Sequence, residues 1–432
     1  MIPHTLSANK KRPRGKPRLL PIFAGALSLL FFIGAARSLH AQATSPAADD
    51  QYLERAKRIL RTTPLIDGHN DLPWRIREDS IARGNVDAYD LRKRTPGHTD
   101  LERLRKGMVG AQFWSVYTPG EYADSGYARV QLEQIDIARR FIAKYPERLS
   151  LALSSNDIKR DFRQGRISSL IGLEGGHAIE NSLGALRMYY ELGVRYMTLT
   201  HNVTLDWADA ALDSAKHNGL TKFGDSVVRE MNRLGMLVDL SHVSPATMSA
   251  ALNVTAAPVI FSHSGARALV NVPRNVPDSI LRRVTANGGI VMVPFVTGFV
   301  SPAVDLYEQS TRPLIKDLQA KYGKDTAGIT REINQWRAAH PAPRATLSQV
   351  ADQIEYVRKV AGVDHVGIGS DFDGITEVVQ GLEDVSTFPA LFAELARRGW
   401  SDADLRKLAG ENLLRVFGEA ESVSRRLQKS TQ

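Results

Sequence analysis

The sequence has 432 residues, 43% of them apolar, which is enough to bury a large core, and it contains no cysteine. The lack of cysteine excludes disulfide bonds, lipid-modified cysteine and thiol-based catalysis. The formal net charge is +9, but seven positive charges precede the first acidic residue, and without these seven the net charge falls to +2. A body this close to neutral has no electrostatic footprint for a polyanion, so we do not expect nucleic-acid binding.

Residues 1–43 have the pattern of an export signal. A cluster of Lys and Arg is followed by an apolar stretch at 19–36 and then by small residues, where a signal peptidase would cut after Ala41 or Ala43. The apolar stretch is long enough for an uncleaved membrane anchor to be the competing interpretation, although a proline and two glycines weaken it as a span. We therefore expect a periplasmic or secreted protein with one domain at 44–432, attached to a membrane only if the segment is retained.

Eight apolar runs bounded by turn residues predict eight β-strands, and helical patterns lie between most of them. Strands that alternate with helices are typical of a (β/α)8 barrel of the TIM type. The segment from Val296 to Asp364 is too long for a simple connection, so we expect a helical excursion between strands 7 and 8 that covers the site or forms an oligomer contact. The predicted strands are 65–71, 109–117, 169–174, 196–202, 237–242, 259–263, 289–295 and 365–371; the predicted helices are 127–145, 183–192, 224–234, 348–360 and 388–398, with 305–322 and 329–339 in the excursion.

Six of the eight predicted strands end in residues that bind metals or move protons. Catalytic groups of (β/α)8 enzymes lie at the carboxyl ends of the strands, so these side chains are expected to gather at one mouth of the barrel. In chain order they are His69 and Asp71, Glu174, His201, His242, His263 and Asp371.

The types and spacing of five of these residues indicate a metal site. His69 and Asp71 are alternate residues of an extended strand and can face one ion together, and imidazole with carboxylate suits zinc. Alone, such a pair is weak evidence for a metal site, because these residue types also cap turns. Glu174 precedes two glycines and is the best candidate for a carboxylate that bridges two ions, although a lone strand-ending acid more often caps a helix. His242 and His263 each follow an apolar run and a serine, which would bring two imidazoles to the same mouth.

Other polar residues are candidates for work on the substrate. If the five groups above hold both ions, His201 and Asp371 are free for substrate polarisation and proton transfer; otherwise either is a further ligand. Arg274 lies between two prolines and could clamp a substrate carboxylate or form an ordinary loop salt bridge. We expect His177 and His365 to pack or to donate hydrogen bonds rather than to bind metal.

Together, seven ordered motifs resemble those of the membrane (renal) dipeptidase family of zinc peptidases, over nearly the whole predicted mature chain. The resemblance implies a (β/α)8 barrel with two zinc ions per chain. His69 and Asp71 would hold one ion and His242 and His263 the other, with Glu174 bridging them. The motifs occupy residues 67–71, 174–177, 198–202, 239–242, 262–264, 274–276 and 369–374.

By the same resemblance, His201 would bind the substrate and steady the oxyanion, Arg274 would help to hold the terminal carboxylate, and Asp371 would handle the proton of the metal-bound water. Family members hydrolyse dipeptides, often with a D-residue at the carboxyl-terminal position, and usually form homodimers. Unlike the animal members, this sequence has neither cysteine nor an apolar carboxyl-terminal tail, so we expect neither a disulfide-linked dimer nor a lipid-anchored product.

We therefore expect a binuclear zinc dipeptidase that uses a metal-bridging hydroxide. One alternative is a related barrel amidohydrolase acting on another small amide, an N-acyl amino acid or a lactone, because the metals do not determine what lies beyond the scissile bond. The other is an exported binding protein with structural metals, against which the retention of both His201 and Asp371 argues. Residues 203–209 match the family less well, so the shape of the substrate pocket is not predicted.

Overall fold

The computed structural model describes residues 46–120, 126–323 and 325–430. The chain divides into two units, Met1–Thr44 and Ser45–Gln432, and all described residues belong to the second. The predicted export signal and its cleavage sites lie outside the described residues. Within the described part of the chain, no helix is both long and apolar enough to cross a bilayer.

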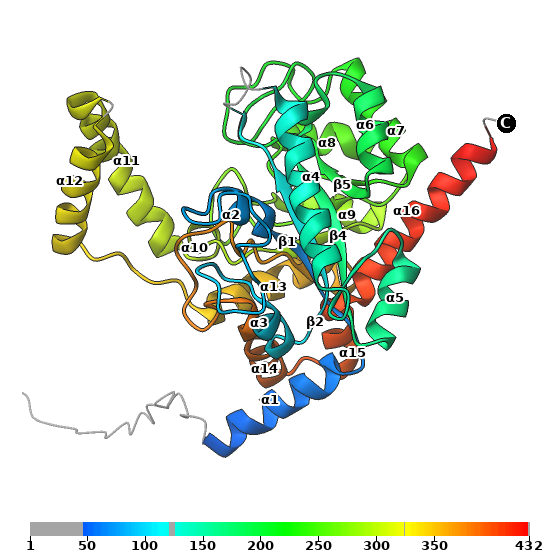
Figure 1. The fold of residues 1–432 in the computed structure, drawn as a ribbon, viewed down its shortest axis with the longest axis horizontal. Coiled ribbons are helices and arrows are strands. Elements are labelled where there is room, and N and C mark those ends of the chain that lie inside the picture. Colours follow the sequence, from blue (N-terminus) through cyan, green and yellow to red (C-terminus); the bar gives the residue numbers. More distant parts are fainter. Residues whose placement is uncertain (1–45, 121–125, 324, 431–432) are drawn as a thin grey trace, which may run out of the picture. The chain divides into compact units, whose positions relative to one another are not determined.

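Eight parallel strands form a closed ring with helices around it (Figure 1). The ring closes where β2 pairs with β4, in a register that places Tyr117 opposite Glu174. The predicted (β/α)8 barrel is therefore confirmed. One short strand that was not predicted, β3, pairs only with the first residues of β4 and is not a member of the ring. The strands are β1 (Leu65–Asn70), β2 (Val109–Tyr117), β3 (Leu149–Leu151), β4 (Ile167–Glu174), β5 (Val194–Thr198), β6 (Leu237–Asp239), β7 (Ile260–Phe261), β8 (Ile290–Val293) and β9 (Val366–Ile368).

Each of the seven predicted helical stretches corresponds to a helix of the structure. The α-helices are α1 (Pro46–Leu60), α2 (Leu72–Arg77), α3 (Leu101–Lys106), α4 (Tyr127–Lys144), α5 (Ser155–Arg163), α6 (Leu183–Glu191), α7 (Lys222–Leu234), α8 (Pro245–Val254), α9 (Asp278–Asn287), α10 (Thr297–Val300), α11 (Pro302–Tyr322), α12 (Thr326–Ala339), α13 (Leu347–Ala361), α14 (Phe388–Arg397), α15 (Asp402–Arg406) and α16 (Asn412–Lys429). Short helical turns are η2 (Gly176–Ile179), η3 (Val363–His365), η4 (Val385–Thr387) and η5 (Lys407–Glu411).

Helix α7 illustrates why the sequence folds locally as it does. The Thr221 side chain accepts a hydrogen bond from the backbone N–H of Gly224 and so caps the first turn. Val227, Val228 and Met231 are buried on the face that packs inward. The helix ends at Gly235, whose φ of 84° is in the left-handed region that glycine adopts readily.

Several strands end earlier than predicted. The chain leaves the extended conformation through tight turns, and His242 and Asp371 both have a left-handed φ of 68°. These side chains are therefore aimed by turn geometry rather than by the pleat of a strand. His69 lies within β1 and Glu174 is the last residue of β4, whereas His201, His242, His263 and Asp371 lie two or three residues beyond β5, β6, β7 and β9.

Large side chains cross the interior of the barrel. The rings of Phe113 on β2 and Tyr196 on β5 lie 5.0 Å apart, although their strands do not pair, so their contact spans the interior. Glycines make room for such side chains: a Cβ atom at Gly172 would overlap the ring of Tyr196, and one at Gly68 would lie 2.6 Å from the sulfur of Met292. The interior of the barrel is thus a packed core rather than a pore.

The predicted excursion between β8 and β9 is present as helices α10, α11 and α12. Figure 1 shows α11 and α12 as a hairpin that projects from the other helices of the domain. Most side chains of α12 are exposed, and Gly328 is its one buried residue within the described part. The start of the excursion, by contrast, contributes Val296 and Phe299 to the pocket described below.

We predict that Gly369→Ala destabilises the protein, because a Cβ atom there would overlap the backbone oxygen of Ser262 and push the ends of β9 and β7 apart. Overpacking of this kind costs about 1–3 kcal/mol. Gly418→Ala is the matched control: it lies within α16, where the added Cβ would meet only the Ser155 hydroxyl at 3.6 Å, and should stabilise by about 0.5–1 kcal/mol. Thermal unfolding of the two variants should therefore shift in opposite directions, and equal midpoints would contradict the packing described here.

Candidate metal centre

The carboxylate of Glu174 lies at the centre of the polar cluster at the carboxyl ends of the strands. The residue is buried, and its Oε2 accepts a hydrogen bond of 3.0 Å from the Ser115 hydroxyl on β2. Behind it the chain turns sharply at Gly175, which has a φ of 110° and where a Cβ atom would overlap the ring of His177. Any other residue at this position would be strained, so the glycine allows the strand to end directly beneath the carboxylate.

The two carboxylate oxygens of Glu174 face different sets of imidazoles. Oε2 lies 3.5 Å from Nε2 of His69, which in turn lies 3.2 Å from Oδ2 of Asp71. Oε1 lies 3.0 Å from Nε2 of His242 and 3.6 Å from Nε2 of His263. The five residues expected to bind metal are thus brought together, with one oxygen of the central carboxylate turned toward each pair.

His201 and Asp371 lie at the edge of the same cluster. Their contacts are the longest in it: Nε2 of His201 is 3.9 Å from Oε1 of Glu174, and Oδ1 of Asp371 is 4.0 Å from Nε2 of His69. Their side chains are also the more exposed, at 15% and 16%, against 7% or less for the other five. Three overlapping triads have ligand atoms within 4.8 Å of one another: His69, Glu174 and His263; Glu174, His201 and His242; and His69, Asp71 and Asp371.

The donor set fits a bound cation. Nε2 of His242 and Nε2 of His263 face each other at 2.9 Å, and Nε2 of His69 is buried without a hydrogen bond among the described residues. Buried imidazole nitrogens directed at one point, next to carboxylate oxygens, form the ligand set that zinc prefers. These residues could therefore hold metal in the space between them.

Burial sets the protonation of the imidazoles. It lowers the pKa of His242 and of His263 well below the usual range, and nearby Arg274 adds to the effect. Both rings are therefore neutral and have a lone pair to offer a cation. Burial also opposes the charged form of His69, but Tyr196 and the carboxylates of Asp71 and Glu174 raise the pKa of His69 overall.

The pKa values of the acids and of His201 are also shifted by burial. Burial raises the pKa of Asp371 well above its ordinary value, and the nearby charges of Asp71 and Glu174 add to this rise. Burial disfavours the charged form of Glu174 as well, but the surrounding imidazoles outweigh it and hold the pKa of Glu174 well below its usual range. Burial lowers the pKa of His201 to about 4.

Each of the three most buried imidazoles is oriented through its second ring nitrogen. Nδ1 of His69 lies 2.8 Å from the Tyr196 hydroxyl, whose side chain reaches it across the barrel interior. The other two have closer partners in the sequence: Nδ1 of His242 lies 3.0 Å from Oδ1 of Asn202, and Nδ1 of His263 lies 2.8 Å from the Ser262 hydroxyl. Such contacts fix the ring so that Nε2 points into the cluster. We did not predict them; Ser262 precedes its histidine in the sequence, but nothing local indicates Tyr196.

Two buried aspartates tie the strand ends together below the cluster. Asp67 on β1 accepts hydrogen bonds from the backbone N–H of Ser370, at 2.7 Å, and from its hydroxyl, at 2.6 Å, just beyond β9. Asp239 on β6 accepts hydrogen bonds of 2.6 Å each from the hydroxyls of Thr198 on β5 and Ser262 beyond β7. These bonds cross-link five strands directly beneath the donors.

Arg274 lies in the same pocket, on the loop before α9. It is buried, and its Nη1 makes no hydrogen bond among the described residues. The guanidinium carbon lies 5.4 Å from the centre of the Phe299 ring, and burial lowers the pKa of Arg274 to about 10, which leaves it charged at neutral pH. Asn275 holds the loop, because its Nδ2 donates hydrogen bonds of 3.0 Å to the backbone oxygens of Val270 and Phe299.

A pocket of about 390 Å³ opens above the cluster. Arg274 is the one Lys or Arg among its described lining residues. Apart from the donors of the cluster, most of the wall is aromatic or aliphatic, and these residues were not singled out as functional in the sequence because they look like ordinary core or loop positions. They are Trp74, Tyr117, Leu212, Val296, Phe299 and Ile375.

The other histidines of the described residues lie outside the cluster. Nε2 of His177 lies 2.7 Å from the backbone oxygen of Thr118, and Nδ1 of His365 lies 2.7 Å from that of Gly289. His98, for which the sequence indicates no role, accepts a hydrogen bond of 2.9 Å at Nδ1 from the backbone N–H of Asp373 and so supports the loop that carries Asp371.

A (β/α)8 barrel with histidines and carboxylates gathered at the carboxyl ends of its strands defines a metal-dependent hydrolase. The sequence profile of the membrane dipeptidase family, peptidase family M19, matches residues 53–431, and the chain belongs to this family. The resemblance predicted from the seven motifs is thereby confirmed. The protein is a metal-dependent dipeptidase, and the family implies small peptide substrates.

Solved structures share the fold. The probable dipeptidase PvdM from Pseudomonas aeruginosa is 24% identical, with a TM-score of 0.75 over 87% of this chain and 99% of that one. A metallopeptidase from Rhodobacter sphaeroides, solved with a phosphinate mimic of the dipeptide L-Ala-D-Ala, is 24% identical, with a TM-score of 0.68 over 83% of this chain and 99% of that one. An amidohydrolase from Pseudomonas aeruginosa is 22% identical, with a TM-score of 0.65 over 84% and 98% of the two chains.

We predict that Glu174→Gln lowers the metal content of the purified protein, because the carboxylate oxygens serve both pairs of donors. Removal of an outer hydrogen-bond partner typically lowers metal affinity about 10- to 100-fold. Removal of this carboxylate should lower it at least as much. Glu230→Gln is the control: this carboxylate on α7 pairs with Arg187 at 2.6 Å and Arg233 at 2.7 Å and should not affect metal binding. Elemental analysis after dialysis compares the two, and equal metal content would show that Glu174 is not a ligand.

Proposed function

We propose that the protein is a binuclear zinc dipeptidase that cleaves the peptide bond of dipeptides and tolerates a D-residue at the carboxyl-terminal position. The observation that carries the proposal is the split contact of Glu174, with Oε2 toward His69 and Oε1 toward His242 and His263. A carboxylate placed between two sets of donors suits two ions that share it. In this arrangement His69 and Asp71 would hold one ion, and His242 and His263 would hold the other.

When bound, the zinc ions would lower the pKa of a water and so supply the nucleophile for attack on the peptide carbonyl. Around them, Arg274 binds the carboxylate of the substrate, since its buried charge has an unused donor in the pocket. His201 lies near enough to the cluster to donate a hydrogen bond to the oxyanion that forms on the carbonyl. Asp371, at the open edge of the cluster, takes a proton during attack and returns it to the leaving amine.

The pocket supports a short substrate. Its volume of about 390 Å³ is near the lower end of the roughly 300–1,000 Å³ of ligand sites in proteins. The Rhodobacter sphaeroides structure that shares the fold holds a mimic of L-Ala-D-Ala, which is compatible with a D-residue next to Arg274. A free carboxylate bound by Arg274, so close to the metal donors, leaves room for one residue beyond the scissile bond.

We also propose that the protein is exported, with residues 1–43 as the signal, and that it acts as a homodimer. The basic and apolar pattern of the N-terminal segment supports export. The dimer is proposed because members of the family usually form homodimers. A retained segment would make the protein membrane-anchored instead.

The proposed function predicts a defined substrate range for the zinc-loaded protein. L-L and L-D dipeptides should be hydrolysed, whereas tripeptides, dipeptide amides, N-acyl amino acids and lactones should be poor substrates, and a chelator should abolish turnover. The assay is chromatography of each substrate and its hydrolysis products across this panel, with zinc added back as the control. Cleavage of a lactone or an N-acyl amino acid without cleavage of dipeptides would make the protein a related amidohydrolase instead, and binding without any turnover would make it a binding protein.

A second prediction separates proton transfer from metal binding. Asp371→Asn should leave two zinc ions bound and lower kcat by about 10²- to 10⁴-fold, because general acid–base catalysis typically contributes that much. Asp352 lies on the surface of α13 and pairs with Arg398, so Asp352→Asn should change neither property. Kinetics and metal analysis on the same preparations give the answer; loss of zinc from the Asp371 variant would identify that residue as a ligand.

A further inference from the structure

A second cavity, of about 280 Å³, lies at the opposite end of the barrel from the metal centre. It opens beside the amino-terminal ends of β2 and β4, where Val109 and Ile167 are the first residues of the two strands. Strand β2 runs from this cavity at Val109 to the catalytic pocket at Tyr117, a distance of roughly 26 Å at about 3.3 Å per residue. A ligand in this amino-terminal pocket would therefore not touch the substrate.

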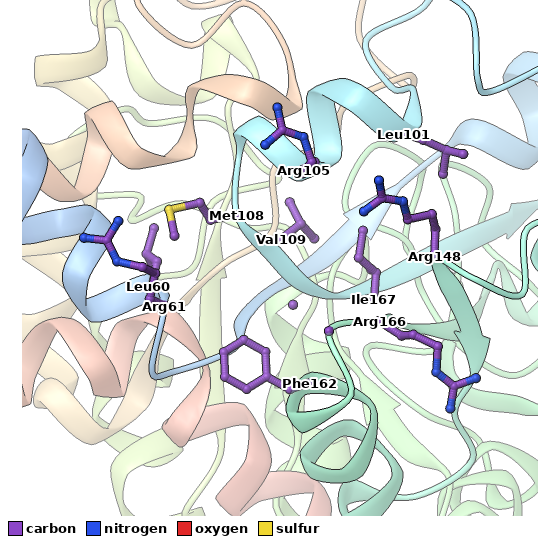
Figure 2. A pocket seen from close by; sticks show the side chains of 12 residues that line it. Leu60, Arg61, Leu101, Arg105, Met108, Val109, Arg148, Phe162, Arg166 and Ile167 are labelled. Atoms are coloured by element: carbon purple, nitrogen blue, oxygen red, sulfur yellow. The ribbon is translucent and has the colours of Figure 1, made fainter.

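The floor of the amino-terminal pocket is apolar. Met108, Val109, Phe162 and Ile167 lie between its rim residues in Figure 2. Val109 and Ile167 belong to the buried core, whereas Met108 and Phe162 remain partly exposed. A partly open apolar floor of this size offers favourable contact to a short hydrocarbon chain or a ring.

The rim of the amino-terminal pocket is formed by four arginines, and no acidic side chain is among the described lining residues. Figure 2 shows Arg61, Arg105, Arg148 and Arg166 around the apolar side chains, with the guanidinium groups of Arg61, Arg105 and Arg166 turned outward and that of Arg148 above Ile167. Carboxylates beside the pocket offset three of these charges, so the positive potential at the opening comes mainly from Arg148. The opening therefore attracts anions.

Three of the four arginines have carboxylate partners at the side of the pocket. Nη2 of Arg105 lies 2.8 Å from Oε1 of Glu102, and Nη2 of Arg166 lies 3.2 Å from Oδ1 of Asp161. Nη2 of Arg61 lies 3.9 Å from Oε2 of Glu54.

In the Arg61 and Arg105 pairs both side chains are more than half exposed, and ion pairs of this kind contribute little to the stability of the fold. Arg148 differs from the other three, because within the described residues its guanidinium has no ion pair or hydrogen bond. It is the free donor that an anion would meet first.

The longest stretch outside the described residues does not match this pocket in charge. The segment before Asp49 contains no acidic residue, so its basic character would oppose docking among four arginines. Residues 121–125 contain two acids, but they connect Gly120 to Gly126, which follow the carboxyl end of β2 at the other end of the barrel. These segments therefore give no reason to place a part of this chain in the pocket.

We propose that the amino-terminal pocket binds a small amphipathic anion, a carboxylate or phosphate attached to a short apolar chain or ring. The anionic group pairs with Arg148 at the rim, and the apolar group packs on Met108, Phe162 and Ile167. This site is separate from the metal centre and does not depend on the identity of the dipeptide substrate.

Octanoate is a suitable probe, titrated by calorimetry into the full-length, zinc-loaded protein at neutral pH. Octanoate should bind saturably, whereas octanamide, which lacks the charge, and acetate, which lacks the chain, should bind at least about tenfold more weakly. Arg148→Gln should weaken octanoate binding by about tenfold or more, the effect of losing one charge-assisted hydrogen bond. Arg229→Gln is the matched control, since Arg229 is exposed on α7 and has no ion pair among the described residues.

Both arginine variants should hydrolyse dipeptides like the unmodified protein, which shows that they are folded. Octanoate binding that persists in the Arg148 variant but disappears in Glu174→Gln would place the ligand at the metal centre and overturn the proposal. Affinity for acetate equal to that for octanoate would overturn it as well. Association with phosphatidylglycerol vesicles without binding of free octanoate would identify a lipid-facing surface in place of a ligand pocket.

Discussion

One buried carboxylate, that of Glu174, sets the conditions that the rest of the metal centre must meet. A carboxylate removed from water is stable only if positive or hydrogen-bonding partners compensate for the lost hydration. Glu174 has the Ser115 hydroxyl and imidazoles from four other strand ends around it. Burial pushes His201, His242 and His263 toward neutrality, whereas the pKa of His69 is raised, so the arrangement leaves a role for a bound cation beside Oε1 of Glu174.

The scaffold beneath Glu174 is built to keep the donors where they are. Asp67 and Asp239 accept hydrogen bonds from the ends of neighbouring strands, and the Nδ1 atoms of three histidines are held by Tyr196, Asn202 and Ser262. Hydrogen bonds inside a protein are strong when every partner is satisfied, so this layer makes the geometry of the site a property of the folded barrel. A site that is formed in advance loses little entropy when metal and substrate bind.

The two ends of the barrel differ in chemistry because the strands are parallel. At the carboxyl ends, His, Asp and Glu side chains gather around one point and Arg274 is the single positive side chain of the described pocket wall. At the amino ends, four arginines surround an apolar floor. Parallel pairing brings all equivalent strand ends to the same face, so each mouth collects residues of similar kind from distant parts of the sequence.

The sequence by itself determined the barrel, its helical excursion and the set of polar residues at the strand ends. Apolar periodicity is a local property, and parallel strands necessarily bring their ends together, so His69, Glu174 and His263 could be grouped without coordinates. Only the tertiary structure decided which oxygen of Glu174 faces which imidazole, that Tyr196 orients His69 from across the interior, and that Arg148 is unpaired beside an apolar floor. These features depend on contacts between residues far apart in the chain, and the pattern of neighbouring residues carries no record of such contacts.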